Sequence, residues 1–226
     1  GPEWCAVLPR VWRDRDESAL RTLLEWARAL GFTGVLIGNL GHLPLVRGLD
    51  FHLYGDYGLN VFNSRSLAYL KDKELESACV SFELRFAQIR DLKKVLRAEA
   101  IVYGRLPLMI TENCLVQNET GCRLDRQGPC VPEDGPCRCG QPNVLVDRTG
   151  AAFPLLPAYG HRTEIQNSKP LYLADRPEHR RLGLAYARLR FTTETAEECV
   201  SVVQNYLDAA PAAGDFTRGL YERGVE

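Results

Sequence analysis

Five of the eight cysteines fall in one polar stretch, residues 104–140, which is rich in glycine and proline. They follow the pattern Cys-x7-Cys-x7-Cys-x6-Cys-x-Cys, formed by Cys114, Cys122, Cys130, Cys137 and Cys139. A set of thiolates in a polar loop suits zinc or an iron–sulfur cluster. Structural zinc sites usually pair cysteines with two to four residues between them, and this stretch has no such pair, so the spacing favours a cluster. Disulfides with leftover free thiols, or inert cysteines, remain the alternatives.

A four-ligand site needs one cysteine fewer than this stretch provides. Cys130 lies between Pro129 and Val131 and is the expected spare. His161, in "YGHRTE", is a possible replacement for one cysteine, although a single histidine of this kind is more often a hydrogen-bonded structural residue. Outside the stretch, Cys5, Cys79 and Cys199 lie in strand or helix patterns and are predicted to be buried core thiols.

A second set of polar residues follows apolar runs: Asn39, Asp56, Asn60, Asn63, Glu83 and Arg105. In a βα barrel such positions form the rim at the carboxyl ends of the strands, where active sites lie. Asp56 and Glu83 can act as acid or base, and Arg105 can hold a carboxylate or phosphate. The candidate catalytic set is Asp56, Asn60, Glu83 and Arg105. The alternative is that these side chains cap helices and pair with one another.

The elements that must position these residues alternate between strand and helix patterns over the first hundred residues. Strands are expected in 5–12, 34–41, 50–63, 77–84 and 98–110, and helices in 16–32, in 64–75 with a Ser64 N-cap, and in 85–97. This alternation indicates βαβ units and a parallel sheet. Four or five strands are too few for a closed eight-stranded barrel. The fold class is therefore α/β: the later half of a TIM-type βα barrel, a cysteine-rich loop, and a small irregular or β C-terminal segment.

Three parts are expected along the chain. Residues 1–110 hold the βα repeats of the partial barrel, 111–142 the cysteine-rich metal or cluster loop, and 143–226 a C-terminal β/α segment. Short β segments are predicted over 143–175. A helix is predicted over 195–210, with Val200, Val203 and Leu207 on one face.

The composition of the chain limits the kinds of partner that it can attract. The 226 residues are 45% hydrophobic and 25% charged, with a formal net charge of -1, so no global field attracts nucleic acid or an anionic membrane. The best local basic run is "RPEHRR" (176–181), a pattern more often found in a solvated loop. No run reaches the roughly 20 apolar residues of a membrane span, and no signal peptide opens the chain. We expect a reducing, cytoplasmic compartment. Gly1-Pro2 resembles a protease scar, which predicts a natural N-terminus further upstream.

Several motifs that define common enzyme classes are missing from the sequence. There is no Gly-x-Ser-x-Gly, no His-Glu-x-x-His and no Gly-x-Gly-x-x-Gly after a strand. Serine hydrolase, zincin and dinucleotide-binding functions are therefore disfavoured.

Several stretches together resemble peptidase family U32, the collagenase-like peptidases: "LPRVW", "GVLIGNLG", "HLYGDYGLNVFNS", "SFELRFAQI", "VYGRLPLMITENC", "RTEIQNSKPLYLAD" and "FTRGLYERGV". The resemblance implies a TIM-type barrel, of which this chain holds the later strands. It also implies a [4Fe–4S] cluster on four cysteines, with Zn²⁺ as the alternative. By this resemblance the ligands are Cys114 and Cys122, followed by Cys137 and Cys139. Because Cys137 and Cys139 are closer together than in familiar members, Cys130 or His161 is a possible substitute.

The same resemblance suggests what the protein does. Several members with a cluster take part in hydroxylating RNA bases or a quinone precursor, which predicts an enzyme that modifies RNA or a small molecule. Other members are recorded as collagenases, so a collagenase-like peptidase is the first alternative. A zinc-stapled structural domain without activity is the second. The expected partners are an RNA or small-molecule substrate and the N-terminal half of the same protein, with no membrane.

Overall fold

The computed structural model describes residues 3–120, 138 and 141–225. The chain forms two compact units, each assembled from separate stretches. The first consists of Gly1–Val102, Arg176–Arg188 and Arg218–Glu226, and the second of Tyr103–Asp175 and Leu189–Thr217. The predicted division into barrel part, cysteine loop and C-terminal segment stays a prediction.

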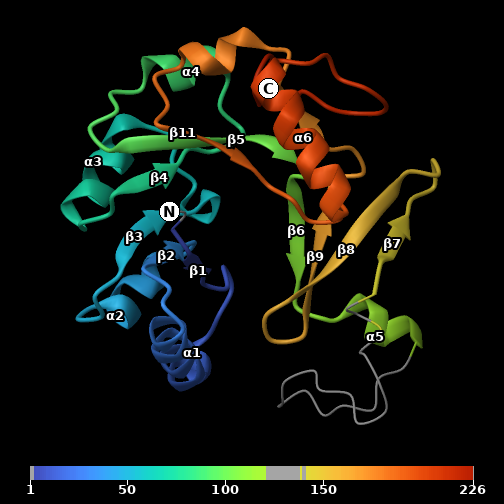
Figure 1. Cartoon of the computed structure of the whole chain (residues 1–226). Helices are drawn as coiled ribbons and strands as arrows, with labels where there is room; N and C mark the ends of the chain where they lie inside the picture. Colours follow the sequence, from blue (N-terminus) through green and yellow to red (C-terminus); the bar gives the residue numbers. More distant parts are fainter. Residues whose placement is uncertain (1–2, 121–137, 139–140, 226) are drawn as a thin grey trace. The chain divides into compact units, whose positions relative to one another are not determined.

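A curled parallel sheet forms the first unit (Figure 1). Its neighbours in order are β1 (Cys5–Val7), β2 (Gly34–Ile37), β3 (His52–Gly55), β4 (Ser77–Cys79) and β5 (Arg97–Gly104), and β11 (Tyr186–Leu189) pairs with β5. The last two residues of β5 belong to the second unit. A curled sheet with helical crossovers is what a partial TIM-like barrel requires. The predicted mixed α/β class with a half-barrel sheet is therefore confirmed.

The helices of the first unit lie along the convex side of this sheet (Figure 1). They are α1 (Glu17–Ala29), α2 (Leu43–Val46), α3 (Ser64–Asp72) and α4 (Phe86–Asp91), with short 3-10 turns η1 (Asp14–Asp16), η2 (Leu40–His42), η3 (Tyr57–Leu59) and η5 (Pro177–Arg181). Helix α1 forms because Leu20, Leu24 and Ala27 share one face, and all three are buried. It ends before Gly31, whose φ of 86° is favourable only for glycine.

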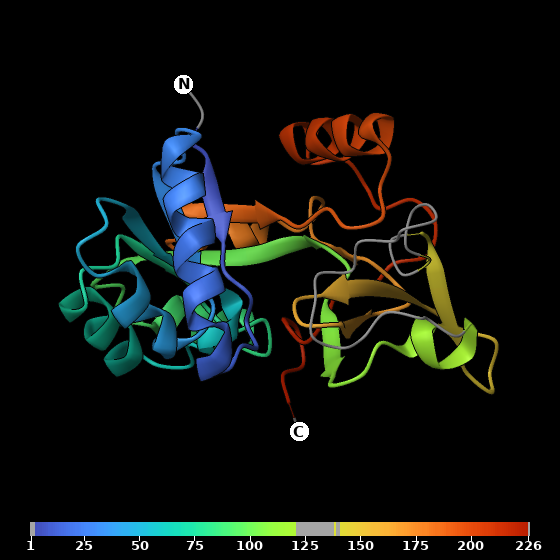
Figure 2. The ribbon, with the colours of Figure 1, turned by 90° about the horizontal axis from the view of Figure 1, so that it is seen from below.

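The second unit contains a four-stranded antiparallel sheet (Figure 2). Its order is β6 (Pro107–Thr111), β9 (Arg162–Gln166), β8 (Ala152–Ala158) and β7 (Asn143–Val146). The remaining elements are α5 (Leu115–Thr120), β10 (Leu171–Tyr172), which pairs with the end of β5, and α6 (Ala196–Asp208). Tyr103 and Tyr172 form an aromatic core with Tyr206 of α6. The short β segments predicted over 143–175 are confirmed.

Several predicted elements were wrong in extent. The strands expected over 5–12, 50–63 and 77–84 cover only Cys5–Val7, His52–Gly55 and Ser77–Cys79. The strand expected over 98–110 is two strands in different sheets, because Gly104 has a φ of 115° and ends β5 before Pro107 begins β6. The helix expected over 85–97 stops at Asp91, where Leu92 adopts an extended conformation and leads into β5. Residues 92–96 form a loop, and only Arg97 of the predicted helix belongs to β5.

Several local predictions also need correction. Helix α3 is capped by Asn63 rather than Ser64, since the Asn63 Oδ1 atom accepts the Ser66 N–H at 2.9 Å. Cys79 is buried as predicted, whereas Cys5 and Cys199 are only half-buried. The predicted apolar face of α6 exists but is exposed, with Val200, Val203 and Leu207 at 71%, 42% and 70% exposure. Among the described residues no helix has both the length and the apolar character that crossing a membrane requires.

Candidate functional site

The loops at the carboxyl ends of β1, β2 and β3 pack directly on one another. A Cβ atom at Gly58 would lie 2.5 Å from the Gly38 carbonyl oxygen and 2.8 Å from the Arg10 side chain. The Arg10 guanidinium in turn lies 5.3 Å from the centre of the Tyr57 ring, a cation–π contact. Only glycine at position 58 allows this approach. The rim predicted from the polar strand ends is therefore a closely packed set of loops.

An ion-paired cluster supports this rim from within the first unit. Arg188, on β11, reaches the carboxylates of Asp56 and Glu99 with different nitrogen atoms. The Asp56 residue is 6% exposed, and the Arg188 side chain is 17% exposed. In the strand register Cys79 lies beside Glu99. One cation thus holds together β3, β5 and β11, which are distant in sequence.

Burial changes the ionisation of this cluster. Desolvation raises the pKa of Glu99 above its usual value, and the neighbouring Asp56 charge adds to this, while Arg188 opposes both. Desolvation also raises the pKa of the Cys79 thiol well above its ordinary range, so Cys79 stays a neutral thiol at physiological pH. Arg188 was not anticipated from sequence. The available signal was a charged residue alternating with apolar ones in "LAYARLRF".

The predicted rim residues have identifiable contacts. Asn39 caps η2, because its Oδ1 atom accepts the Gly41 N–H at 2.8 Å and its Nδ2 donates to the Arg10 carbonyl at 3.2 Å. Asn60 adopts the left-handed conformation, with φ of 49°, at the end of η3. Glu83 is half-buried, and its backbone N–H donates to the Ser81 hydroxyl at 3.3 Å. These contacts are structural, and the catalytic roles of Asp56, Asn60 and Glu83 stay predictions.

Arg105 belongs to the second unit, where its guanidinium organises a loop. Its Nη1 atom donates to the Asn167 carbonyl at 3.0 Å and to the Ser168 carbonyl, and its Nε atom donates to the Thr193 hydroxyl at 3.3 Å. These are the contacts of a loop-stabilising arginine. The predicted role of Arg105 in holding an anionic substrate stays a prediction.

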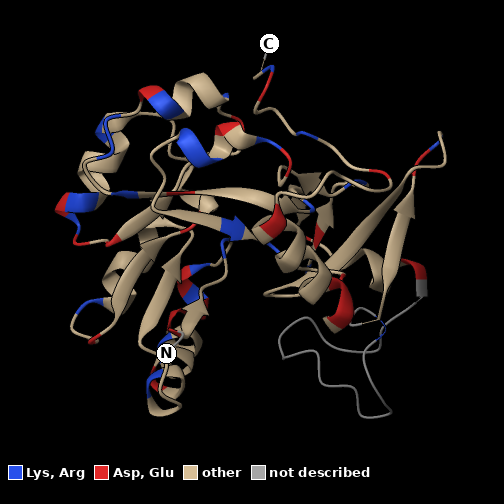
Figure 3. Ribbon diagram, turned by 45° about the horizontal axis from the view of Figure 1, so that its top comes forward, with Lys and Arg blue, Asp and Glu red and all other residues tan. Residues whose placement is uncertain are grey.

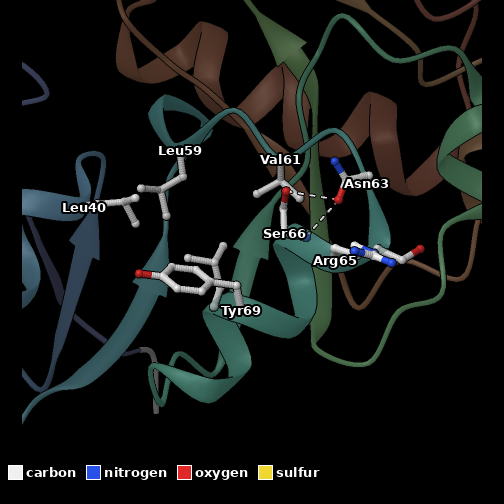
Figure 4. Close-up of a pocket in the computed structure, with 9 residues that line it drawn as sticks. Leu40, Leu59, Val61, Asn63, Arg65, Ser66 and Tyr69 are labelled. Atoms are coloured by element: carbon white, nitrogen blue, oxygen red, sulfur yellow. Dashed lines mark hydrogen bonds between the residues drawn. The ribbon is translucent and has the colours of Figure 1, made fainter.

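A groove of about 700 Å³ opens beside these loops in the first unit (Figure 4). Leu40, Leu59 and Val61 supply an apolar wall, and the Tyr69 ring lies along it. Its polar edge comes from the start of α3, where Asn63, Ser64, Arg65 and Ser66 line the opening. The volume and the mainly apolar lining with a few polar groups are typical of small-molecule sites. Tyr69 is 47% exposed, so part of this aromatic residue can contact a ligand.

Cys114, the first cysteine of the cysteine stretch, has a defined position in the second unit. Cys114 is buried, at 8% exposure, and its Sγ atom accepts the Gln117 N–H at 3.4 Å. The next residue is tied to β9, because the Leu115 N–H donates to the Thr163 hydroxyl at 3.0 Å. His161 has a φ of 59° in the turn before β9. The sheet therefore fixes the position and orientation of Cys114.

The other four predicted or substitute cysteine ligands, Cys122, Cys130, Cys137 and Cys139, lie outside the described residues. Within 3–120, 138 and 141–225, no group of three or more His, Cys, Asp or Glu side chains is placed to hold a metal ion. The fit to a cluster therefore rests on donor chemistry, since thiolates are the usual ligands of iron–sulfur clusters. Cys114 is buried and its Sγ atom accepts a backbone N–H, and hydrogen bonds to the sulfurs are a feature of cluster sites.

Comparison with known proteins supplies the family. Neither the curated proteins nor the solved structures contain a match to this chain. A family model, described as Peptidase family U32, matches residues 3–144, which is more than half of the chain and spans the whole cysteine stretch. The predicted resemblance is confirmed, and the chain belongs to peptidase family U32.

Proposed function

We propose that this chain carries the substrate groove and the cluster-binding loop of an iron–sulfur-dependent enzyme that modifies an RNA base or a small molecule. The observation that supports this most is the position of the cysteine stretch. Its cysteines follow β6, begin with the anchored thiol of Cys114, and lie inside the matched family region. Residues 3–144 therefore include both the rim and the thiols.

Each part of the chain has a task in this proposal. Cys114, Cys122, Cys137 and Cys139 would hold the cluster, with Cys130 or His161 as a possible replacement for one of them. A bound cluster supplies iron chemistry that amino-acid side chains lack. The groove beside α3 binds the planar or apolar part of the substrate. The ion pairs of Arg188 keep the loops around the groove rigid, which holds the substrate in one orientation.

The expected partner within the same protein is an N-terminal half-barrel. Among the described residues β1 pairs only with β2, so its outer edge has unpaired backbone groups. Trp4 and Val7, at and beside this edge, are each 67% exposed. A further parallel strand placed along β1 would satisfy the backbone groups and cover these side chains. Comparing the activity of this chain with that of a longer protein tests this partner.

The first experiment is anaerobic purification followed by iron, sulfide and zinc analysis and an absorption spectrum. We expect about four iron and four sulfide per chain, and loss of both in Cys114→Ala. The matched control is Cys199→Ala, because Cys199 is half-buried on α6 and outside the cysteine stretch. One zinc and no iron would instead favour a structural site. Retention of the full iron content by Cys114→Ala would refute the ligand assignment.

The second experiment addresses the reaction. Nucleosides from the RNA of cells with and without the protein are compared by mass spectrometry, and a hydroxylated base is expected only when the protein and its cysteines are intact. The peptidase alternative is tested with gelatin and casein. Cleavage that persists in Cys114→Ala would favour a peptidase over a cluster-dependent modifying enzyme.

A further inference from the structure

Three segments of the first unit concentrate positive charge. They are residues 85–94 of α4 and its following loop, residues 176–182 around η5, and residues 218–225 near the chain end. Together they carry nine Lys or Arg and three Asp or Glu, a net charge of +6. The rest of the chain carries 19 Lys or Arg and 26 Asp or Glu, a net charge of −7. The total charge of −1 therefore hides a strong separation of charge.

These three segments pack together. Helix α4 contacts η5, and the Phe86 N–H of α4 donates to the Tyr221 carbonyl at 2.8 Å. The Phe86 and Tyr221 rings stack with their centres 5.3 Å apart. Tyr221 is 1% exposed, and its hydroxyl donates to the Ile101 carbonyl of β5 at 2.6 Å. The chain end is therefore fixed onto the sheet beside α4, so the three segments that carry these charges lie together in the first unit, where Lys and Arg positions are marked blue (Figure 3).

This cationic surface stays positive after its own ion pairs are counted. Its exposed cations are Arg85, Arg90, Lys93, Arg180, Arg181 and Arg223. The exposed carboxylates are Asp91, Glu178 and Glu222, of which Asp91 pairs with Arg90 at 2.8 Å and Glu222 with Arg176 at 3.0 Å. Cations spread over three segments suit an extended polyanion better than a single small anion.

The cationic surface reaches the groove described above. The Lys93 N–H donates to the Ser64 hydroxyl at 2.8 Å, and Ser64 and Arg65 line the opening of the groove. Within the groove the Tyr69 ring is half exposed, and the Lys73 ammonium lies 5.2 Å from its centre. An aromatic ring next to cations is the arrangement on which unpaired bases stack in single-stranded nucleic acid complexes.

We infer that the cationic surface binds the phosphate backbone of single-stranded RNA and leads one nucleotide into the groove, where its base stacks on Tyr69. This inference rests on the proposed function, from which it selects RNA rather than a small molecule as the substrate. Phosphate contacts supply most of the affinity and fix the register of the strand. An anionic membrane would be attracted by the same charges, but its lipid headgroups contain no base that would stack on an aromatic ring in the groove.

The test is fluorescence anisotropy with the full chain and a labelled single-stranded RNA of about 20 nucleotides, between about 50 and 200 mM KCl. The variant is Arg181→Ala/Arg223→Ala, and the control is Arg15→Ala/Arg28→Ala, which removes two exposed arginines near α1. Loss of two phosphate contacts should lower the slope of log K against log salt by about 1.4 and weaken binding roughly 10- to 100-fold at low salt. The control should match the wild type, and thermal unfolding should show that both variants fold.

The outcomes separate the two proposals. Equal weakening in variant and control, no RNA binding, or binding only to phosphatidylserine-rich vesicles would overturn the cationic surface as an RNA site. If base modification continues while Arg181→Ala/Arg223→Ala binds RNA normally, the surface assignment fails and the function stands. If the variant loses RNA binding and no nucleoside depends on the protein, the surface assignment stands and the modifying function fails. Tyr69→Ala should lower affinity with little change in the salt slope, because stacking involves no phosphate.

Discussion

Replacing Arg188 by methionine tests the reasoning about the rim most directly. Arg188 compensates the buried Asp56 carboxylate and the Glu99 carboxylate, whose side chain is 17% exposed, and a methionine keeps the length of the side chain while removing its charge. Removing one partner from a buried ion pair costs about 3–5 kcal/mol, because the remaining charge is uncompensated. For a chain of this length each kcal/mol lowers the melting temperature by about 2–4 °C. We therefore expect a decrease of roughly 6–20 °C at neutral pH.

The pH dependence of this loss has a defined sign. Desolvation already raises the pKa of Glu99, and without Arg188 the opposing effect is lost, so the folded protein gains stability as Glu99 is protonated. The difference between Arg188→Met and wild type should be smaller at acidic than at neutral pH. Chemical denaturation at several pH values measures this difference. A loss that is independent of pH would indicate damaged packing and not uncompensated charge.

A neutral triple variant provides the matched comparison. Asp56→Asn/Arg188→Met/Glu99→Gln leaves no charge in the cluster and should recover most of the stability lost in Arg188→Met, since replacing a whole buried ion-pair set is often close to neutral. Arg28→Met, at an exposed position on α1, should change stability by less than about 0.5 kcal/mol. If the triple variant were less stable than Arg188→Met alone, or if Arg188→Met lost under about 1 kcal/mol, the account of the cluster would be refuted.

Two further predictions concern the same loops. Burial lowers the pKa of His42 from an ordinary 6.5 to about 4. The Nε2 atom of His42 is within hydrogen-bonding distance of the Pro9 carbonyl, at 3.1 Å. The free energy of unfolding should therefore fall as the pH drops from 6.5 towards 4. Between about pH 7 and 5 this loss is roughly 2 kcal/mol by linkage, and denaturation of His42→Gln should show a correspondingly flatter profile. Gly58→Ala should cost about 1–3 kcal/mol through its collision with the Gly38 carbonyl, measured by denaturation. An unchanged midpoint would mean that the rim loops move apart freely.

The sequence was informative about repeating patterns and less so about where elements stop. Alternating strand and helix patterns predicted a parallel sheet because each βα unit carries its own periodicity. The end of β5 was missed because "AEAIVYGRLPLMI" is mostly apolar, and Gly104, with its positive φ, lies between the two strands. The Ser64 cap was misplaced by one residue, since Asn63 and Ser64 are both good N-cap residues.

The sequence located some polar strand ends but not their partners. Asn39 and Asp56 do follow β2 and β3 closely, at the edge where carboxyl ends of parallel strands meet, whereas Arg105 lies in the second unit. Arg188 was missed because it is 132 residues from Asp56, and pairing over that separation depends on where β11 packs. The cationic surface shows the same limitation. "RPEHRR" alone resembles a solvated loop. Only in the structure does it pack against α4 and the chain end, and the three segments together carry a net charge of +6.

These observations divide the rim residues into two groups. Asn39, Asn63 and Asp56 use their polar atoms on caps and ion pairs within the first unit, as the contacts above describe. A substrate that replaced those contacts would have to break the structure that holds the loops. Side chains that line the groove while remaining half exposed, such as Tyr69, can meet a ligand without that cost. Binding should therefore depend on the groove and the cationic surface, and the capped and ion-paired residues should act through the rigidity they give to both.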